Sequence, residues 1–210
     1  MNKELEEELK KALSHMNPKW SMQNNFYDFN SNFIYIVKTY DEVVRLSKAR
    51  NINPEYALHR WYNFNTSIYC EQLFVEYGAK KESDTKNKEI DIYINNIPYD
   101  VKVSVYPKAL ANHPYDLNTR DGKNEMIKWL YEHQSQQGRK HYKNRLFIIC
   151  DGKDQEECLK LKSDFDQIKT KIKEFMDNSK NGFNKLKVSD HGIQVTVISD
   201  IIYITPKENS

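Results

Sequence analysis

The 210-residue chain has no apolar run that approaches the roughly 20 residues of a membrane-spanning helix. Its first residues, MNKELEEELKKAL, alternate charged residues with leucine and lack the apolar centre of a signal peptide. Its three cysteines are an odd number and form no CxxC pair, which argues against a disulfide framework and against a zinc site. We therefore expect no membrane contact and a location in a reducing cytoplasm.

Several functional signatures are also missing from the sequence. There is no GxGxxG, P-loop or GxSxG motif, which removes support for nucleotide-driven enzymes and serine hydrolases. The six histidines show no HxxxH pairing. The 32 Lys and Arg exceed the 30 Asp and Glu by only two, so the chain is not of the class that holds DNA by overall charge. Positive charge is instead concentrated in one segment, the basic run RKHYKNR at residues 139–145.

The length and patterning predict one mixed α/β domain with an appendage. A chain of this length buries roughly 70% of its unfolded surface, which is enough for a hydrophobic core. We divide it into a mainly helical N-terminal extension, residues 1–54, packed on an α/β domain, residues 55–210.

The N-terminal extension shows short periodic segments. Leucine at every fourth position predicts an exposed amphipathic helix over residues 1–16. Residues 17–32 are rich in Asn, Ser and aromatic residues and predict irregular structure. The apolar Phe33 to Val37 predicts a short strand, after which Asp41 is expected to cap a helix.

The second part alternates helices and strands. We expect a helix from Asn53-Pro54 to Gly78, strands over 89–94 and 97–105, a helix over 121–137, a central strand over 146–150, a helix over 158–175, and one or two strands within 193–204.

The two strands around Asn95-Asn96 predict a hairpin. Asn tolerates the positive φ that a two-residue hairpin loop requires. In the resulting register one face is entirely apolar or aromatic: Ile90, Ile92, Ile94, Ile97, Tyr99, Val101, Val103 and Val105. A shift of one residue would mix the two faces, so the pattern fixes the register.

The same register places Asp91 opposite Asp100 on the polar face, with Cβ atoms about 5 Å apart. At an effective dielectric of about 20, two such charges repel by roughly 3 kcal/mol. A proton, a basic neighbour or a divalent cation must offset this repulsion. Mg²⁺ prefers oxygen ligands from one or two carboxylates plus phosphate, and Lys102 lies on the same face as Asp100.

Another interpretation of this triplet is a solvated strand face with an ordinary salt bridge. Acid-x-Lys triplets occur five times in the sequence, and four fall in predicted helix termini or loops. Only Asp100-Val101-Lys102 lies in an alternating apolar strand with a second acid opposite. This combination favours a functional site.

Asp91, followed by Asp100-x-Lys102 on an adjacent strand after a helix that carries Glu, resembles the PD-(D/E)XK nuclease superfamily, the restriction-endonuclease-like fold. The family core, a helix, a three-stranded meander, a helix and a strand, would cover about residues 60–150. The resemblance implies that the first meander strand lies within Ala79 to Lys86. Ile90 stands where the family pattern has Pro.

The resemblance also implies a Glu from the preceding helix. Glu71 lies at helical spacing from Ile68, Phe74 and Val75, on the apolar side, whereas Glu76 is the alternative on a neighbouring stripe. By resemblance, Glu71, Asp91, Asp100 and Lys102 would be catalytic.

The implied reaction is metal-dependent hydrolysis of a phosphodiester. Asp91, Asp100, the carbonyl of Val101 and Glu71 would hold Mg²⁺, which Mn²⁺ can replace, and Lys102 would orient the attacking water or stabilise the transition state.

The nucleic-acid contacts are expected after the meander. Gln134 or Gln137 could position substrate, or simply belong to a polar helix end. The basic run could contact phosphates through Arg139, Lys140, Lys143 and Arg145, or form a solvated loop.

The leading hypothesis is a Mg²⁺-dependent endonuclease that acts on double-stranded DNA, of restriction or phage-defence type. A repair, junction-resolving or RNA endonuclease of the same fold is one rival, and a non-catalytic nucleic-acid-binding module is another. Cleavage of both strands of a duplex would favour a homodimer.

Overall fold

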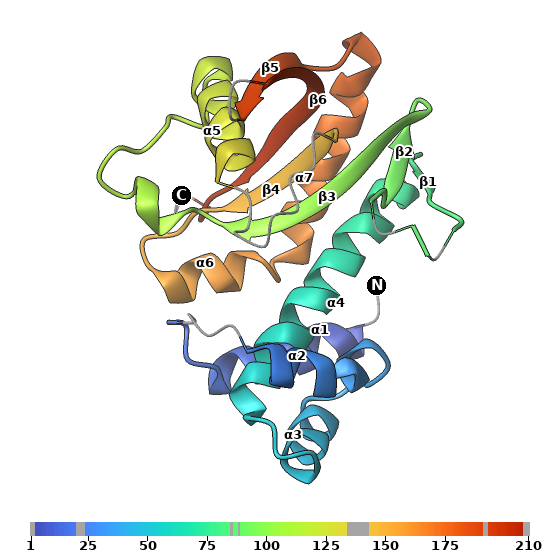
Figure 1. Ribbon diagram of the computed structural model, residues 1–210, viewed down its shortest axis with the longest axis vertical. Coiled ribbons are helices and arrows are strands. Elements are labelled where there is room, and N and C mark those ends of the chain that lie inside the picture. The colour runs from blue at the N-terminus through green and yellow to red at the C-terminus, as the bar shows by residue number, and fades with distance from the viewer. Residues whose placement is uncertain are drawn as a thin grey trace.

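A six-stranded mixed sheet with helices on both faces forms the centre of the protein (Figure 1). This computed structural model describes residues 3–19, 24–84, 86–87, 89–133, 143–190 and 193–207. The mixed α/β class expected from the sequence is confirmed. Among the described residues, no helix is both long and apolar enough to cross a membrane.

The elements follow one another along the chain in a nearly regular alternation after the N-terminal helices. The helices are α1 (Lys3–His15), α2 (Asn25–Asn30), α3 (Tyr40–Ala49), α4 (Pro54–Glu76), α5 (Arg120–Glu132), α6 (Gln155–Leu161) and α7 (Phe165–Asn178). The strands are β1 (Lys80–Lys81), β2 (Ile92–Ile94), β3 (Ile97–Val105), β4 (Arg145–Cys150), β5 (Lys185–Asp190) and β6 (Ile193–Ile204). Short 3-10 turns occupy Asn32–Tyr35, Lys108–Leu110 and Ser179–Asn181.

The strand order across the sheet is β1-β2-β3-β4-β6-β5. β1, β2 and β3 form an antiparallel meander, β3, β4 and β6 run parallel, and β5 pairs antiparallel with β6. Every residue of β4 is buried, as expected for an apolar strand between parallel neighbours with helices on both faces. β1 lies inside the range predicted for the first meander strand.

The β2–β3 hairpin has the predicted register. Ile94 pairs with Ile97 and Ile92 pairs with Tyr99. Asn95 and Asn96 have φ of 50° and 64°, the left-handed conformation required by a two-residue turn. Asn adopts this conformation more readily than most residues other than glycine.

Two apolar clusters hold the helices on the sheet. α4, α6 and α7 cover one face, where Trp61, Phe74 and Ile148 are buried. α5 covers the other face, where Met126, Ile127 and Phe147 are buried.

The N-terminal helices pack around the first half of α4 (Figure 1). Leu9 of α1 and Val43 of α3 belong to the same apolar cluster as the sheet residues on that face. The helix predicted over residues 1–16 is confirmed over Lys3–His15, and Leu9 of its apolar face is fully buried.

Three predictions in the N-terminal extension are wrong. Phe33 to Val37 is not a strand, because Phe33 and Ile34 pack into the core from the 3-10 turn. The cap of α3 is Thr39 and not Asp41: the Thr39 hydroxyl oxygen accepts a hydrogen bond from the Glu42 N–H. The irregular segment contains the short helix α2.

Three predictions in the second part also need correction. The helix predicted over 158–175 is two helices, because the Asp164 side chain accepts a hydrogen bond from the Gln167 N–H and starts α7. β5 was not predicted. The strand expected from Glu89 begins only at Ile92, since the Asp91 N–H donates to the Tyr99 carbonyl at 2.9 Å outside the regular ladder.

Candidate active site

The predicted acidic residues and lysine come together at one end of the β2–β3 pair. Asp100 and Lys102 project from β3, Asp91 directly precedes β2, and Glu71 projects from the C-terminal half of α4. Burial raises the pKa of Glu71 most, Asp91 and Asp100 raise it further, and Lys81 and Lys102 lower it, so these groups share one electrostatic environment. This convergence was predicted from the hairpin register and from the helical spacing of Glu71.

Asp100 is a buried carboxylate with a cation on each oxygen. Lys102 Nζ lies 2.6 Å from Oδ1 and Arg145 Nε lies 3.0 Å from Oδ2. The Asp100 and Arg145 side chains are each 10% exposed, whereas Lys102 is 51% exposed. Asp100 and Lys102 therefore lie on one face, as predicted, and the lysine reaches both the acid and solvent.

The Asp91 side chain, and not a backbone carbonyl, accepts a hydrogen bond from the backbone of β3. Its carboxylate accepts a hydrogen bond from the Val101 N–H at 2.7 Å. Burial raises the pKa of Asp91, the Val101 hydrogen bond lowers it, and repulsion by Asp100 and a hydrogen bond to Asp100 raise it further. The two carboxylates are thus direct neighbours, although regular strand pairing ends at Ile92 and Tyr99.

The carbonyl of Val101 lies on the same side of β3 as Asp91. The N–H and C=O of one residue in a strand point to the same neighbour, and the Val101 N–H is already bonded to Asp91. Asp100 uses the opposite edge, where its N–H donates to the Asn144 carbonyl at 3.0 Å. The Val101 carbonyl is therefore available to the site, as the resemblance implied.

Glu71 is buried and is the helical acid that faces the other two. Burial, followed by repulsion from Asp91, raises its pKa to about 7, and Lys81 counteracts this from 3.8 Å. The alternative, Glu76, is 51% exposed and forms an ion pair with Lys169 at 2.6 Å. The structure therefore favours Glu71 over Glu76.

The donor chemistry of the site suits a hard divalent cation, because carboxylate and carbonyl oxygens are the ligands that Mg²⁺ prefers. Within the described part of the chain, no group of three or more His, Cys, Asp or Glu is arranged to hold a metal ion. The residues present fit a cation held by the Asp91 and Asp100 carboxylates with water and substrate phosphate, and not a preformed cage of three acids. Val101 and Glu71 are the neighbouring oxygens.

The predicted nucleic-acid contacts are placed only in part. Gln134, Arg139 and Lys140, together with Gln137, lie outside the described residues. Lys143 is described and forms an ion pair with Glu89. Arg145 differs from the prediction: it begins β4 and not a loop, and its guanidinium is buried against Asp100 and 5.6 Å from the centre of the Tyr131 ring.

Two contacts of the site were not predicted, although Arg145 itself was expected to bind phosphate. Arg145 is the register partner of Asp100 in the parallel β3–β4 pair, and Lys81 lies on β1 next to Glu71. Both depend on pairings between strands that are far apart in sequence or very short. No local pattern in the sequence indicates them.

Comparison with known proteins gives no further assignment: no family model, no curated protein and no solved structure matches this chain. The interpretation of the site therefore depends on its geometry.

Proposed function

We propose that this protein is a metal-dependent nuclease that hydrolyses phosphodiester bonds in DNA, of restriction or phage-defence type. One observation carries the proposal: Asp91, Asp100, Lys102 and Glu71 meet at the end of a two-stranded hairpin, where the half-buried Asp91 lies beside the buried Asp100 and a solvent-accessible lysine pairs with Asp100. Adjacent acids that are shielded from water cost free energy, and this cost is explained if they bind a cation during function.

The order of elements supports the same proposal. From α4 to β4 the chain runs helix, three antiparallel strands, helix and parallel strand. This is the order that the PD-(D/E)XK resemblance implies, over about the residues it implies. The order of elements alone supports only the architecture. The proposed chemistry depends on the acidic residues.

Each residue has a role that follows from its position. Asp91 and Asp100 would hold Mg²⁺, with the Val101 carbonyl and Glu71 as further oxygens. Bound there, the metal would lower the pKa of a water and stabilise charge on the phosphoryl oxygens. The Lys102 side chain is half exposed and its Nζ lies 2.6 Å from Asp100, so the amine can contact a phosphate or water beside that acid. The Val101 N–H fixes the orientation of the Asp91 carboxylate.

Double-stranded DNA is the proposed substrate, and a two-fold dimer would place one site on each strand. Lys143 and the basic run that precedes it would contact backbone phosphates, which fixes the position of the duplex without reading its sequence. A repair, junction-resolving or RNA endonuclease would use the same residues.

One observation favours a second candidate, a non-catalytic nucleic-acid-binding module. Both oxygens of Asp100 already face cationic side chains, which neutralise the acid without a metal. In such a module Arg145 and Lys102 would serve stability, and binding would be independent of divalent cations.

Plasmid cleavage with Mg²⁺ or Mn²⁺ distinguishes the two candidates. The wild type is expected to cut and Asp100→Ala to be inactive. Asp177→Ala, an exposed acid paired with lysines on α7, is the matched control and should cut like the wild type. A wild type that binds DNA but never cuts with either metal would support the binding module.

A further inference from the structure

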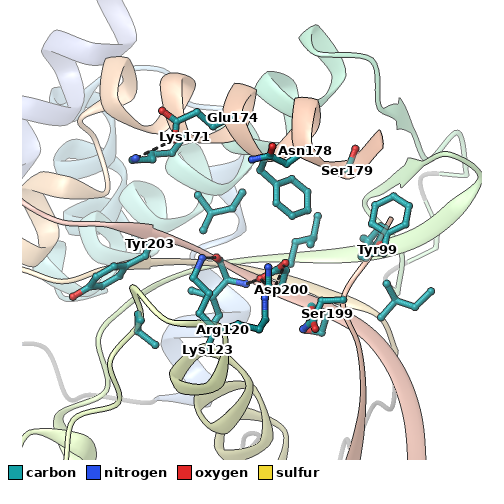
Figure 2. A pocket seen from close by; sticks show the side chains of 18 of the residues that line it. Tyr99, Arg120, Lys123, Lys171, Glu174, Asn178, Ser179, Ser199, Asp200 and Tyr203 are labelled. Atoms are coloured by element: carbon teal, nitrogen blue, oxygen red, sulfur yellow. Dashed lines mark hydrogen bonds and ion pairs between the residues drawn. The ribbon is translucent and has the colours of Figure 1, made fainter. Parts of the chain in front are cut away.

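A second candidate site lies away from the acidic residues, in a groove of about 770 Å³ between α5 and α7 (Figure 2). β6 forms its floor and carries Ser199, Asp200 and Tyr203. Arg120 and Lys123 enter from α5, and Lys171 and Glu174 from α7. Its volume is within the range of small-ligand sites, about 300–1,000 Å³. None of the four proposed catalytic residues lines it.

Cationic side chains outnumber acids in the groove. Arg120 donates to both oxygens of Asp200, at 2.9 and 2.8 Å, and Lys171 pairs with Glu174 at 3.0 Å. Lys123 Nζ instead donates to the carbonyl of Ile201 at 2.8 Å. Burial lowers the pKa of Lys123, Asp200 raises it, and the positive charges of Arg120 and Lys171 lower it further. Lys123 is thus a partly buried cation beside two other cations, an arrangement that a bound anion would stabilise.

The floor of the groove is closed to an added strand. β5 pairs with β6 only as far as Ile198, and no other strand in the described part of the chain pairs with the outer edge of β6 beyond that point. Side chains instead form hydrogen bonds with the backbone along this edge. Asn184 donates to the Ser199 carbonyl, Lys123 donates to the Ile201 carbonyl, and the Asp200 carboxylate accepts from the Ile201 N–H. An extended peptide would have to displace these bonds, which favours a small ligand.

Tyr99 adds an unsatisfied hydroxyl to the wall of the groove. The residue is 1% exposed, and within the described part of the chain its hydroxyl has no hydrogen-bond partner. Its ring centroid lies 6.0 Å from that of Phe183, and both residues line the groove with Phe175 and Leu146. A buried hydroxyl without a partner costs about 1–3 kcal/mol. A ligand that offers an acceptor to this hydroxyl would recover that cost.

We propose that the groove binds a nucleoside phosphate, with the phosphate at Lys123, Arg120 and Lys171 and the ring system against Tyr99 and Phe183. The cations would bind the phosphate and the aromatic side chains would pack against the base. The Tyr99 hydroxyl would donate a hydrogen bond to the ligand. The ligand is either a free nucleotide or the phosphorylated end of a nucleic acid. The proposal is independent of nuclease activity.

Calorimetric titration of the full chain tests this proposal, with EDTA present to keep divalent cations from the acidic site. The probes are AMP, adenosine, inorganic phosphate and a 5′-phosphorylated trinucleotide. AMP or the trinucleotide is expected to bind more tightly than adenosine and phosphate. Saturation by AMP identifies a free nucleotide as the ligand, and saturation by the trinucleotide alone identifies a nucleic-acid end.

Variants of the groove locate the binding. Lys123→Met should weaken it by about tenfold or more, through loss of a charged hydrogen bond, and Tyr99→Phe by about threefold. Lys128→Met is the matched control: this lysine is on the same helix, pairs with Glu125 and does not line the groove. Melting temperatures verify folding. Failure of AMP and the trinucleotide to exceed adenosine and phosphate, or equal binding by both groove variants and the wild type, overturns the proposal.

Discussion

Arg145 and Asp100 are register partners on adjacent parallel strands, and their side chains form a buried ion pair at 3.0 Å. Asp100 is one of the two proposed metal-binding carboxylates, and the Arg145 guanidinium also lies near the Tyr131 ring. A buried pair of this kind restricts where the carboxylate can point. Arg145 therefore connects the fold of the sheet to the geometry of the site.

Arg145→Met should destabilise the protein by about 3 kcal/mol, because it leaves the buried Asp100 carboxylate without its main partner. Lys102 still neutralises one oxygen, which keeps the loss at the low end of the usual range. Urea unfolding of Arg145→Met, Asp100→Asn and the double variant measures the pair. The double variant should be more stable than the sum of the two single losses predicts. Simple additivity would show that the pair does not hold the structure together.

Divalent cation should raise the melting temperature, because it binds the native Asp91–Asp100 pair and not the unfolded chain. Asp91→Asn should reduce this effect. It should also stabilise the metal-free protein, since burial and repulsion by Asp100 raise the pKa of Asp91 and penalise its ionised form. Thermal unfolding in EDTA and in millimolar Mg²⁺ or Mn²⁺ measures both effects. Identical melting temperatures in all conditions would contradict a functional metal site.

Lys102→Ala removes the accessible cation of the site but keeps both acids. If Lys102 acts mainly in the transition state, single-turnover cleavage should fall by about 10²-fold or more while DNA affinity changes little. Lys143→Ala should instead weaken binding to every sequence and reduce the salt dependence of the affinity by about one unit of slope. Cleavage at the wild-type rate by Lys102→Ala would exclude its proposed role.

The hairpin and its polar face were predictable because their signals are local. Alternation around Asn95-Asn96 fixes which residues share a face, and this was enough to place Lys102 beside Asp100 and both near Asp91. The buried position of Glu71 was predictable only in part: Phe74 on the same side of the helix is buried, whereas Val75, which the spacing also placed there, is 39% exposed.

The parts that failed depend on tertiary context. Phe33 and Ile34 are apolar because they pack on a helix, and local sequence does not distinguish this from a strand. β5 was missed, and its place in the sheet depends on its pairing with β6. The contact between Arg145 and Asp100 joins positions 45 residues apart and requires the parallel β3–β4 register, which the hydrophobic pattern does not specify.

Glu71→Gln should stabilise the metal-free protein, and the gain should grow with pH. The pKa of Glu71 is about 7 in the folded protein, against an ordinary value of 4.5. Between these values the folded state binds more protons than the unfolded chain, so the free energy of unfolding falls as pH rises from 4.5 through 7. Gln does not ionise, and the variant avoids this loss.

The expected gain for Glu71→Gln is near zero at pH 4.5 and about 2 kcal/mol at pH 8, after allowance for solvent screening of the partly accessible carboxylate. Urea unfolding in EDTA at several pH values measures it. Glu76→Gln, on the exposed side of the same helix, is the matched control and should not reproduce the pH-dependent gain. With saturating Mg²⁺ the order should reverse if Glu71 contributes an oxygen to the metal, because the variant loses that ligand. A gain for Glu71→Gln that is equal at pH 5 and pH 8 would show that Glu71 is not held in a buried acidic cluster.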